Sequence, residues 1–289
     1  MDGVSPQLRS FHHSEFPPER VRAERDATIS VCVPARECAE TIVPIVETLV
    51  ALREQGAIDQ VAVVDAASAD GTADLASGAG ADVHQQAALL PDQGPVLGKG
   101  DAMWRALTVL DGDVICFLDG DSERFGPHFA CGLAGAVACE PGVRFAKASY
   151  RRPFRVGEAE LPEGGGRVNE LTARPLLRLF FPDLADVRQP LAGEIAARRD
   201  LLERLPFATG YAVEIAMLID AHRAAAPEGL AQVDLDVRQN RHQPLSALAP
   251  MADAVLRAVA VRLEREERLA GVVPDAPVER PPLATLAAS

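Results

Sequence analysis

Residues 115–121 read "ICFLDGD", an apolar run that ends in two aspartates, Asp119 and Asp121, separated by Gly120. The apolar residues predict a short buried strand. Carboxylates that follow such a strand lie at its carboxyl end, which is the edge where ligands bind in parallel α/β sheets. The stretch therefore indicates both the class of fold and the place of the functional site.

Strand and helix patterns alternate along the chain before this stretch. Apolar runs at residues 29–35 and 61–66 predict two further strands, each followed by helical spacing. A Gly-rich turn at residues 98–100 opens another helix. Strand, helix and strand in succession imply right-handed crossovers and a parallel arrangement. We therefore predict an α/β fold in which helices flank a mostly parallel sheet.

The composition divides the chain into four parts. Residues 1–27 are rich in proline and charge and predict an N-terminal arm, whereas residues 28–150 hold the alternating α/β pattern. Residues 151–270 are less regular and include a long amphipathic helix, predicted for residues 245–266. Residues 271–289 are rich in proline and alanine and predict a flexible tail.

The bulk composition excludes some classes of function. The 289 residues carry a formal charge of −13, so general binding to nucleic acid or to an anionic membrane is not expected. The N-terminus is polar and no apolar run reaches the ~18 residues of a spanning helix, so we expect neither a signal peptide nor a membrane anchor. Five cysteines without a CxxC pattern predict reduced thiols and a cytoplasmic protein.

The Asp119-Gly120-Asp121 triplet is a candidate metal site. Hard divalent cations such as Mg²⁺ or Mn²⁺ take oxygen ligands, usually one or two carboxylates together with substrate phosphates. Two neighbouring carboxylates also repel each other unless a cation or a proton lies between them. The alternative is a solvated turn, since these residue types are common in turns. The place of the triplet, directly after a buried strand, favours the metal site.

Two Gly-rich segments are candidate anion sites. Lys99 lies between two glycines at a predicted helix N-terminus, where backbone N–H groups and the helix dipole favour a phosphate. Arg167 follows three glycines in "EGGGRVNEL", residues 163–171, and its forked guanidinium suits a carboxylate or a phosphate. Each segment could equally be a flexible loop or linker. Two anion sites around one metal site suggest a transfer between two anionic substrates.

Further charged residues stand out by their surroundings. Glu214 lies within the apolar helical stretch "YAVEIAM", where a carboxylate usually has a partner or a function. Arg238, Asn240 and His242 follow a predicted strand at residues 230–237. His242 is a possible metal ligand, although a single histidine is more often structural or exposed.

These motifs occur together with two long signatures, "GGGRVNELTARPLL" at residues 164–177 and "LPFATGYAVEIAMLID" at residues 205–220. With them the chain resembles the glucosyl-3-phosphoglycerate synthases of actinobacteria, in a family that also holds mannosyl-3-phosphoglycerate synthases. The likeness runs collinearly from about residue 28 to residue 265. It implies a GT-A nucleotide-sugar fold with a C-terminal part for acceptor binding and dimerisation. It also implies a homodimer and a metal-dependent retaining glycosyltransferase that moves glucose from UDP-glucose to 3-phosphoglycerate.

The resemblance assigns roles to individual residues. It implies catalytic roles for Glu214, Leu191 and Lys99, with Leu191 near the anomeric carbon. It implies acceptor binding by Gly166, Arg167 and Asn169, and metal binding by Asp121 with Asn240 or His242. It implies a donor site made of Pro34, Ala35, Arg36, Cys38, Ser68, Lys99, Asp119, Gly120 and Arg238.

Three positions depart from the family pattern. Cys38 stands where the family has a glutamate near the uracil, and Asn169 stands where a threonine helps to hold the acceptor. Asn240 replaces a metal-binding histidine, and His242 follows two residues later. Either the Asn240 amide oxygen or His242 could complete the metal site. The departures leave open a different small anionic acceptor, or transfer of mannose from GDP-mannose.

Two rival classes share parts of this pattern. A nucleotidyltransferase also combines a parallel α/β sheet, carboxylates and Mg²⁺, but it needs a Gly-rich loop directly after the first strand. The corresponding segment here, "PARECAETI" at residues 34–42, contains no glycine. The second rival is a non-catalytic relative that binds a nucleotide sugar without turnover, which the asparagine at position 240 would favour.

Overall fold

The chain folds around one large, mostly parallel sheet. The computed structural model describes residues 8–156, 159–161, 165–225, 227–238, 244–271 and 275–286. Eight strands follow the order β1-β11-β6-β9-β5-β2-β3-β4, and every neighbouring pair is parallel except the two pairs made by β9. This confirms the predicted fold class. The strands are β1 (Arg9–His12), β2 (Ile29–Ala35), β3 (Gln60–Asp65), β4 (Asp82–Gln85), β5 (Val114–Phe117), β6 (Phe145–Arg151), β9 (Ile195–Arg198) and β11 (Leu230–Val237).

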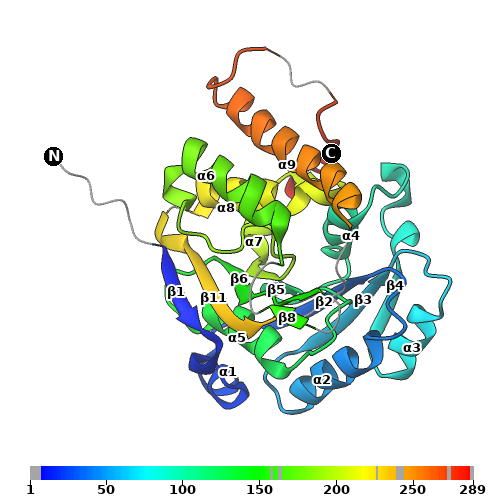
Figure 1. Cartoon of the computed structure of the whole chain (residues 1–289). Coiled ribbons are helices and arrows are strands. Elements are labelled where there is room, and N and C mark those ends of the chain that lie inside the picture. The colour runs from blue at the N-terminus through cyan, green and yellow to red at the C-terminus, as the bar shows by residue number, and fades with distance from the viewer. Residues whose placement is uncertain are drawn as a thin grey trace.

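Helices cover both faces of the sheet (Figure 1). On one face lie α1 (Pro18–Glu24), α2 (Ile42–Glu54) and α5 (Pro127–Ala138). On the other lie α4 (Lys99–Ala106), α6 (Arg174–Phe180), α8 (Val213–Ala225) and α9 (Leu245–Arg265). The remaining elements are short: α3 (Thr72–Gly78), α7 (Arg199–Leu202), α10 (Leu283–Leu286), β7 (Phe154–Val156) with β8 (Ala159–Leu161), and β10 (Phe207–Ala208) with β12 (Glu279–Arg280).

Alternation along the strands fills two hydrophobic cores. In β3, Val61 and Val63 pack in the core beneath α2 and α5, whereas Ala62 and Val64 pack in the core beneath α4 and α8. Successive side chains of a strand point to opposite faces, so a strand covered on both sides is apolar throughout. The continuous apolar runs of the sequence are therefore explained by burial on both faces.

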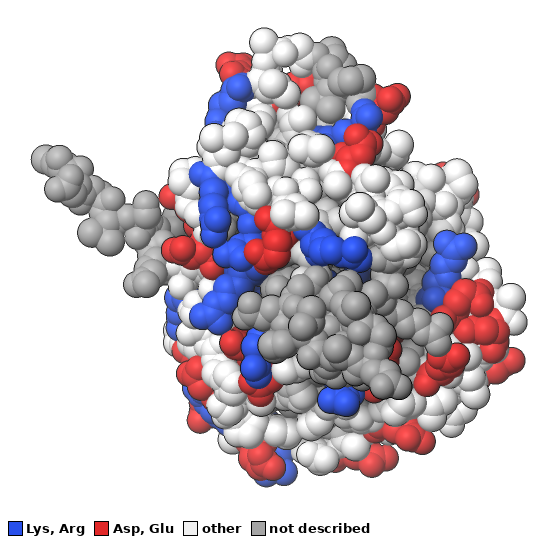
Figure 2. Space-filling view, viewed as in Figure 1, with Lys and Arg blue, Asp and Glu red and all other residues white. Residues whose placement is uncertain are grey.

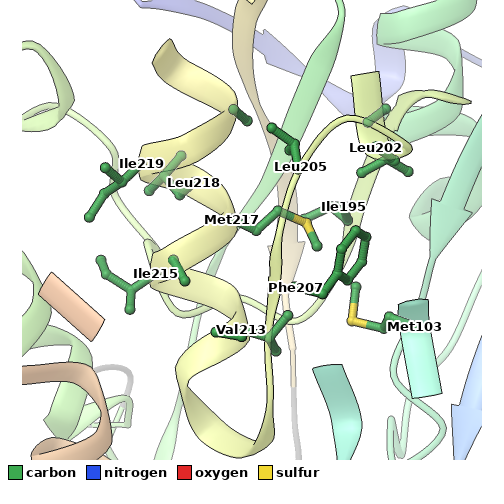
Figure 3. Close-up of a cluster of buried hydrophobic side chains, with 14 of the residues drawn as sticks. Met103, Ile195, Leu202, Leu205, Phe207, Val213, Ile215, Met217, Leu218 and Ile219 are labelled. Atoms are coloured by element: carbon green, nitrogen blue, oxygen red, sulfur yellow. The ribbon is translucent and has the colours of Figure 1, made fainter. Parts of the chain in front are cut away.

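The second core gathers around α8 (Figure 3). Met217 of this helix points toward Phe207 and Ile195, and Met103 of α4 lies on the far side of Phe207. All four side chains are at most 3% exposed. This packing fixes the start of α8 against α4, and the two helices carry candidate site residues in their first turns.

The two ends of the chain contribute more than the arm and the tail that we predicted. β1 adds an edge strand parallel to β11, and Phe16 and Val21 behind it are completely buried. Near the other end, Arg280 of β12 is buried and donates to Asp101 of α4 at 2.7 Å. Partners far away in the sequence, more than two hundred residues for β1, give these short end segments a structure that local sequence does not show.

Two observations limit where a functional site can lie. Within the described part of the chain, no helix is both long and apolar enough to cross a lipid bilayer. A hollow of about 530 Å³ opens at the amino ends of the parallel strands. Arg144 and Arg198 on its wall are already paired with Asp200 and Asp26. The chemistry predicted from sequence lies at the opposite edge of the sheet.

Candidate active site

Two strands of opposite direction bring three carboxylates to the carboxyl edge of the sheet. β5 ends at Phe117, and Asp119 and Asp121 follow directly. β9 runs antiparallel to β5 with Ile195 opposite Phe117, so Glu194 just before β9 reaches the same edge. Glu194 is 1% exposed. Sequence reasoning missed it, because nothing local in "LAGEIAARRD" signals an antiparallel strand inserted between parallel ones.

Lys99 joins Asp119 to Glu214. Its Nζ lies 2.5 Å from Asp119 Oδ1 and 3.1 Å from Glu214 Oε1. Lys99 is the first residue of α4, and Glu214 lies in the first turn of α8. Gly100 lets α4 approach closely, because a Cβ at this position would overlap the carbonyl of Ala208. The "GKG" motif therefore places an ammonium group between two carboxylates from different elements.

Arg238 is the second cation of the site, and it contacts three carboxylates. Its guanidinium lies 2.9 Å from Asp119, 2.7 Å from Asp121 and 2.9 Å from Glu194. Glu194 also accepts a hydrogen bond of 2.9 Å from the Tyr150 hydroxyl. Arg238 is only 4% exposed, so it is a buried cation that its carboxylate partners stabilise.

The charges shift one another's pKa values. Burial alone would raise the pKa of Asp119, but the charges of Lys99 and Arg238 lower it below its ordinary range. Burial raises the pKa of Glu194, and Arg238 opposes that shift. Lys147 of β6 is 2% exposed, and burial lowers its pKa to about 8. Clusters of mutually shifted groups at a strand edge are typical of functional sites.

The ion pair between Lys99 and Asp119 leaves room only for a glycine at position 193. A Cβ at position 193 would overlap both Lys99 Nζ and the Asp119 carboxylate. The loop before β9 therefore passes directly over the ion pair, and only a glycine leaves room for it. This close approach could not be predicted from the "PLAGE" sequence.

Gly120 likewise allows close packing, here beneath the carboxylates of Asp119 and Asp121. A Cβ there would lie 3.2 Å from Cys38 Sγ and 3.3 Å from a Val33 methyl group. The Gly120 carbonyl accepts a hydrogen bond of 2.6 Å from the Thr41 hydroxyl. Cys38 is 8% exposed and burial raises its pKa to about 11, so it is a packed thiol rather than a reactive one.

The loops after β2 and β3 are joined next to these carboxylates. Ser68 Oγ accepts from the Glu37 backbone N–H at 2.9 Å, and Glu37 Oε1 accepts from the Ala69 N–H at 2.8 Å. Glu37 adopts a φ of 52°, which turns the chain sharply after Pro34, Ala35 and Arg36. The nucleotide-binding residues predicted at the ends of β2 and β3 therefore lie together on one rim of the site, the nucleotide rim.

The Gly-rich segment lies against Arg152. The Gly165 N–H donates to the Arg152 carbonyl at 3.1 Å, and Gly166 has a φ of 72° that suits glycine. Arg152 and Arg238 lie over the Tyr150 ring, at 5.8 and 5.6 Å from its centroid. Tyr150 thus connects the Gly-rich segment, which leads into Arg167, to the cation that binds Asp121.

Asn169 is buried and holds the chain near Leu191. Its Oδ1 accepts from the Leu191 N–H at 3.4 Å, and its Nδ2 donates to the Arg188 carbonyl at 3.2 Å. It is 2% exposed, in the π-helical turn Asn169–Ala173 that precedes α6. The predicted acceptor residue Asn169 and the predicted catalytic residue Leu191 therefore lie side by side.

The site suits a divalent cation at Asp121. Asp121 Oδ1 is paired with Arg238, its side chain is 59% exposed, and its Oδ2 has no ion-pair partner among the residues that the structure describes. The directly paired set contains four carboxylates and two cations, which leaves an excess of negative charge. Oxygen ligands and negative charge fit Mg²⁺ or Mn²⁺. The other two predicted ligands, Asn240 and His242, lie outside the described residues.

The face of the molecule seen in Figure 2 carries scattered basic groups. Figure 2 shows several Lys and Arg side chains around the central area that is not described, while acidic side chains extend along the lower right margin. The acidic net charge of the chain is therefore not spread evenly over this face. A local basic rim permits an anionic ligand on a protein of negative net charge.

Comparison with known proteins agrees with this geometry. Residues 30–125 match the model of the glycosyl transferase family 2. The glucosyl-3-phosphoglycerate synthase of Petrotoga mobilis is 41% identical over 267 residues, which cover 90% of this chain and 82% of that protein. The chain belongs to the glucosyl-3-phosphoglycerate synthase family. It is thereby a glycosyltransferase, as the resemblance implied.

Solved structures of the family are also similar throughout. The mannosyl-3-phosphoglycerate synthase of Rubrobacter xylanophilus has a TM-score of 0.88 at 43% identity, covering 96% of both chains. The glucosyl-3-phosphoglycerate synthase of Mycobacterium tuberculosis was solved with Mn²⁺, UDP-glucose and phosphoglyceric acid. It has a TM-score of 0.81 at 35% identity, covering 96% of this chain and 99% of that chain. The family thus includes enzymes named for two different sugars.

Proposed function

We propose that the chain transfers a glucosyl group from UDP-glucose to 3-phosphoglycerate, with Mg²⁺ or Mn²⁺, and with retention at the anomeric carbon. The observation that carries the proposal is the cluster in which Lys99 and Arg238 bind the carboxylates of Asp119 and Asp121 at the sheet edge. The family relative from Mycobacterium tuberculosis, with Mn²⁺, UDP-glucose and phosphoglyceric acid bound, supports the choice of ligands.

The donor half of the site would act mainly by holding positive charges in fixed positions near the diphosphate. A divalent cation bound at Asp121 would neutralise the diphosphate of the leaving group. Lys99 and Arg238 would donate to the same group, and both are already oriented by ion pairs in the protein. Because these cations need no reorganisation, they stabilise charge that develops during the transfer. Asp119 keeps Lys99 in place and is poised next to the nucleotide rim formed around Ser68.

The acceptor half would act through positioning. Arg167 and the Gly166 backbone would bind the anionic end of 3-phosphoglycerate. Asn169 would act indirectly, because its amide groups are engaged by Leu191 and Arg188 of the chain itself. It would fix Leu191 at the wall of the sugar site. An asparagine can serve this purpose where the family has a threonine.

The ion pairing of Glu214 bears on which of two retaining mechanisms the enzyme would use. This carboxylate is ion-paired with Lys99 at 3.1 Å, which reduces its strength as a nucleophile. We therefore favour a same-face transfer in which the leaving phosphate assists deprotonation of the acceptor hydroxyl. Trapping of a covalent adduct on Glu214 would contradict this mechanism and indicate double displacement.

The oligomeric state and the compartment are also part of the proposal. The resemblance implies a homodimer, and light scattering that gives the mass of a single chain would remove it. All five cysteines are free thiols, four of them buried, which agrees with a reducing cytoplasm.

The proposal is tested by a transfer assay. Purified protein is mixed with UDP-glucose, D-3-phosphoglycerate and Mg²⁺, with and without chelator, and the products are read by mass spectrometry. We expect chelator-sensitive glucosyl-3-phosphoglycerate. Slow UDP release without this product would retain the donor and reject the acceptor.

The 43% identity to a mannosyl-3-phosphoglycerate synthase favours a second candidate, transfer of mannose from GDP-mannose. Cys38 also departs from the glutamate expected near uracil. GDP-mannose in a parallel reaction, and then both donors in competition, decides between the two. Faster product formation from GDP-mannose would reassign the donor while leaving the acceptor unchanged.

A further inference from the structure

Two histidines and one aspartate converge at the outer edge of the sheet. His12 ends β1, His13 follows it, and Asp236 lies near the end of the neighbouring strand β11 (Figure 1). The Nε2 atoms of His12 and His13 lie 3.4 and 2.8 Å from the two oxygens of Asp236. One donor atom from each of the three residues lies within 4.8 Å of the others. None of them belongs to the active site described above.

The backbone turns Asp236 toward the histidines. Asp236 has a φ of 66°, a conformation that is costly for a residue with a side chain. Here the pairing of β11 with β6 becomes irregular between Asp234 and Val237. The Asp236 N–H donates to the Asp234 carboxylate at 3.0 Å, which closes the local turn.

The histidine rings are also oriented by their neighbours. The His13 ring lies 4.6 Å, centroid to centroid, from the His128 ring. His13 packs on Gly132 of α5, where an added Cβ would lie 3.1 Å from His13 Cβ. His12 Nδ1 accepts a hydrogen bond from the Ser14 backbone N–H at 3.3 Å and lies 2.7 Å from Ser14 Oγ. Binding of an ion at Nε2 would place the imidazole proton on Nδ1, where it would be donated to Ser14 Oγ in place of the bond from the Ser14 N–H. Both Nε2 atoms are thus directed at one carboxylate from a supported position.

We propose that His12, His13 and Asp236 form a binding site for a transition-metal ion of the Zn²⁺ type, separate from the catalytic metal site. Two imidazoles and a carboxylate suit Zn²⁺, Co²⁺ or Ni²⁺, whereas Mg²⁺ prefers oxygen ligands. Ligand atoms at the corners of a tetrahedron around Zn²⁺ are about 3.3 Å apart. One ligand atom from each of the three residues lies within 4.8 Å of the others, so modest side-chain adjustment is needed to reach this spacing. A water molecule would complete four ligands.

The ion would connect the edge of the sheet to the active site. Asp236 lies two residues before Arg238, and the Arg238 N–H donates to the Arg151 carbonyl at 3.1 Å. An ion that joins Asp236 to β1 and to the following turn would hold the end of β11. The cation that binds Asp119 and Asp121 emerges from this segment. The proposal does not depend on which sugar or acceptor the enzyme uses.

The experiment measures binding of Zn²⁺ to the metal-free full-length protein in excess Mg²⁺, which occupies the oxygen-rich catalytic site. Equilibrium dialysis gives the stoichiometry, and Co²⁺ in place of Zn²⁺ gives the absorption bands of a tetrahedral site. We expect one Zn²⁺ per chain beyond any bound by the variant that lacks both His12 and His13. His12→Asn with His13→Asn should weaken this binding at least tenfold and abolish the Co²⁺ bands.

Two further variants make the result decisive. His222→Asn removes a histidine of α8 that lies 3.7 Å from Asp183 and far along the chain from the proposed ligands, so Zn²⁺ binding should be unchanged. His12→Asn alone alters only a partly exposed side chain and should weaken binding even if the double variant folds poorly. Unchanged Zn²⁺ stoichiometry in the His12 and His13 variants would overturn the proposal, and so would the absence of Zn²⁺ binding to the wild-type protein. In either case the cluster is only a pair of His–Asp ion pairs.

Discussion

The proposed donor half and the proposed acceptor half of the site are built in different ways. On the donor side, strand ends and helix starts deliver Lys99, Asp119 and Arg238 into one network of ion pairs. On the acceptor side, Gly166 and Asn169 are placed by backbone contacts and by a buried amide. The donor half is therefore preorganised by charge, and the acceptor half by chain geometry. Substitutions should separate the two halves by the kinetic constant that they change.

The largest effect is expected from Asp121→Ala on the donor side. Without this carboxylate the catalytic metal would lose the ligand that we propose for it, and metal-dependent turnover should fall about 1,000-fold or more. The fold should persist, because the Asp121 side chain is 59% exposed. Initial rates at several Mg²⁺ concentrations, with circular dichroism for the fold, measure both effects.

A matched control for Asp121→Ala is Asp253→Ala on α9. Asp253 is 58% exposed and also pairs with an arginine, Arg257, at 2.7 Å, but it lies outside the site. Its activity should equal that of the wild-type protein. Full activity of Asp121→Ala would show that the Asp-Gly-Asp segment is only a turn.

Gly193→Ala should have the next largest effect, through geometry rather than charge. The added methyl group would overlap Lys99 Nζ and the Asp119 carboxylate, so the ion pair must move. A displacement of this kind within a catalytic site can cost about 100-fold in rate. The loss should appear in kcat for both donor and acceptor titrations. Gly78→Ala, where an added Cβ meets nothing within 4 Å, is the control that should leave kcat unchanged.

The same contrast explains how much could be predicted from sequence. Lys99, Asp121 and Arg238 were identified because each is a charge at the end of an apolar or Gly-rich segment. Glu194 and Gly193 were missed, since their role depends on β9, an antiparallel strand whose partners lie elsewhere in the chain. Local pattern gives the parallel α/β framework, but long-range pairing decides which loop crosses the site.

Long-range pairing also explains the difference at the chain ends. Residues 9–12 have no strong strand pattern of their own, yet β1 pairs with β11 and brings His12 and His13 beside Asp236. The histidine cluster could not be predicted, because Asp236 is more than two hundred residues from the two histidines in sequence. Charge patterns within one segment are visible in the sequence, whereas clusters assembled across the sheet are not.

Arg167→Ala sharpens the comparison on the acceptor side. If Arg167 binds only the anionic end of the acceptor, its loss should raise the acceptor KM about tenfold, which corresponds to ~1.4 kcal/mol. The KM for UDP-glucose should stay the same. Steady-state kinetics with each substrate varied in turn measures the two constants. An increase confined to the donor KM would move Arg167 to the donor half.

The smallest effect concerns Lys147, which lies on β6 close to the charges of Glu214, Lys99 and Glu194. Burial lowers its pKa to about 8, so the folded chain releases this proton near pH 8 while the unfolded chain keeps it to about pH 10.5. Between these values the unfolded state binds more protons, and stability must therefore rise with pH. The contribution is roughly 1 kcal/mol between pH 8 and pH 9. It is absent below pH 8, where both states are protonated.

Lys147→Met isolates this contribution. Above pH 9 the buried thiols act in the opposite sense, because burial raises the pKa of Cys131 to about 12 and unfolded thiols ionise first. The variant keeps those thiols and lacks only the lysine. Urea unfolding at pH 7, 8 and 9 should give a free energy of unfolding that rises for the wild-type protein relative to the variant. Parallel profiles would mean that Lys147 keeps its proton, and that the carboxylates of both halves stabilise it as a third cation of the site.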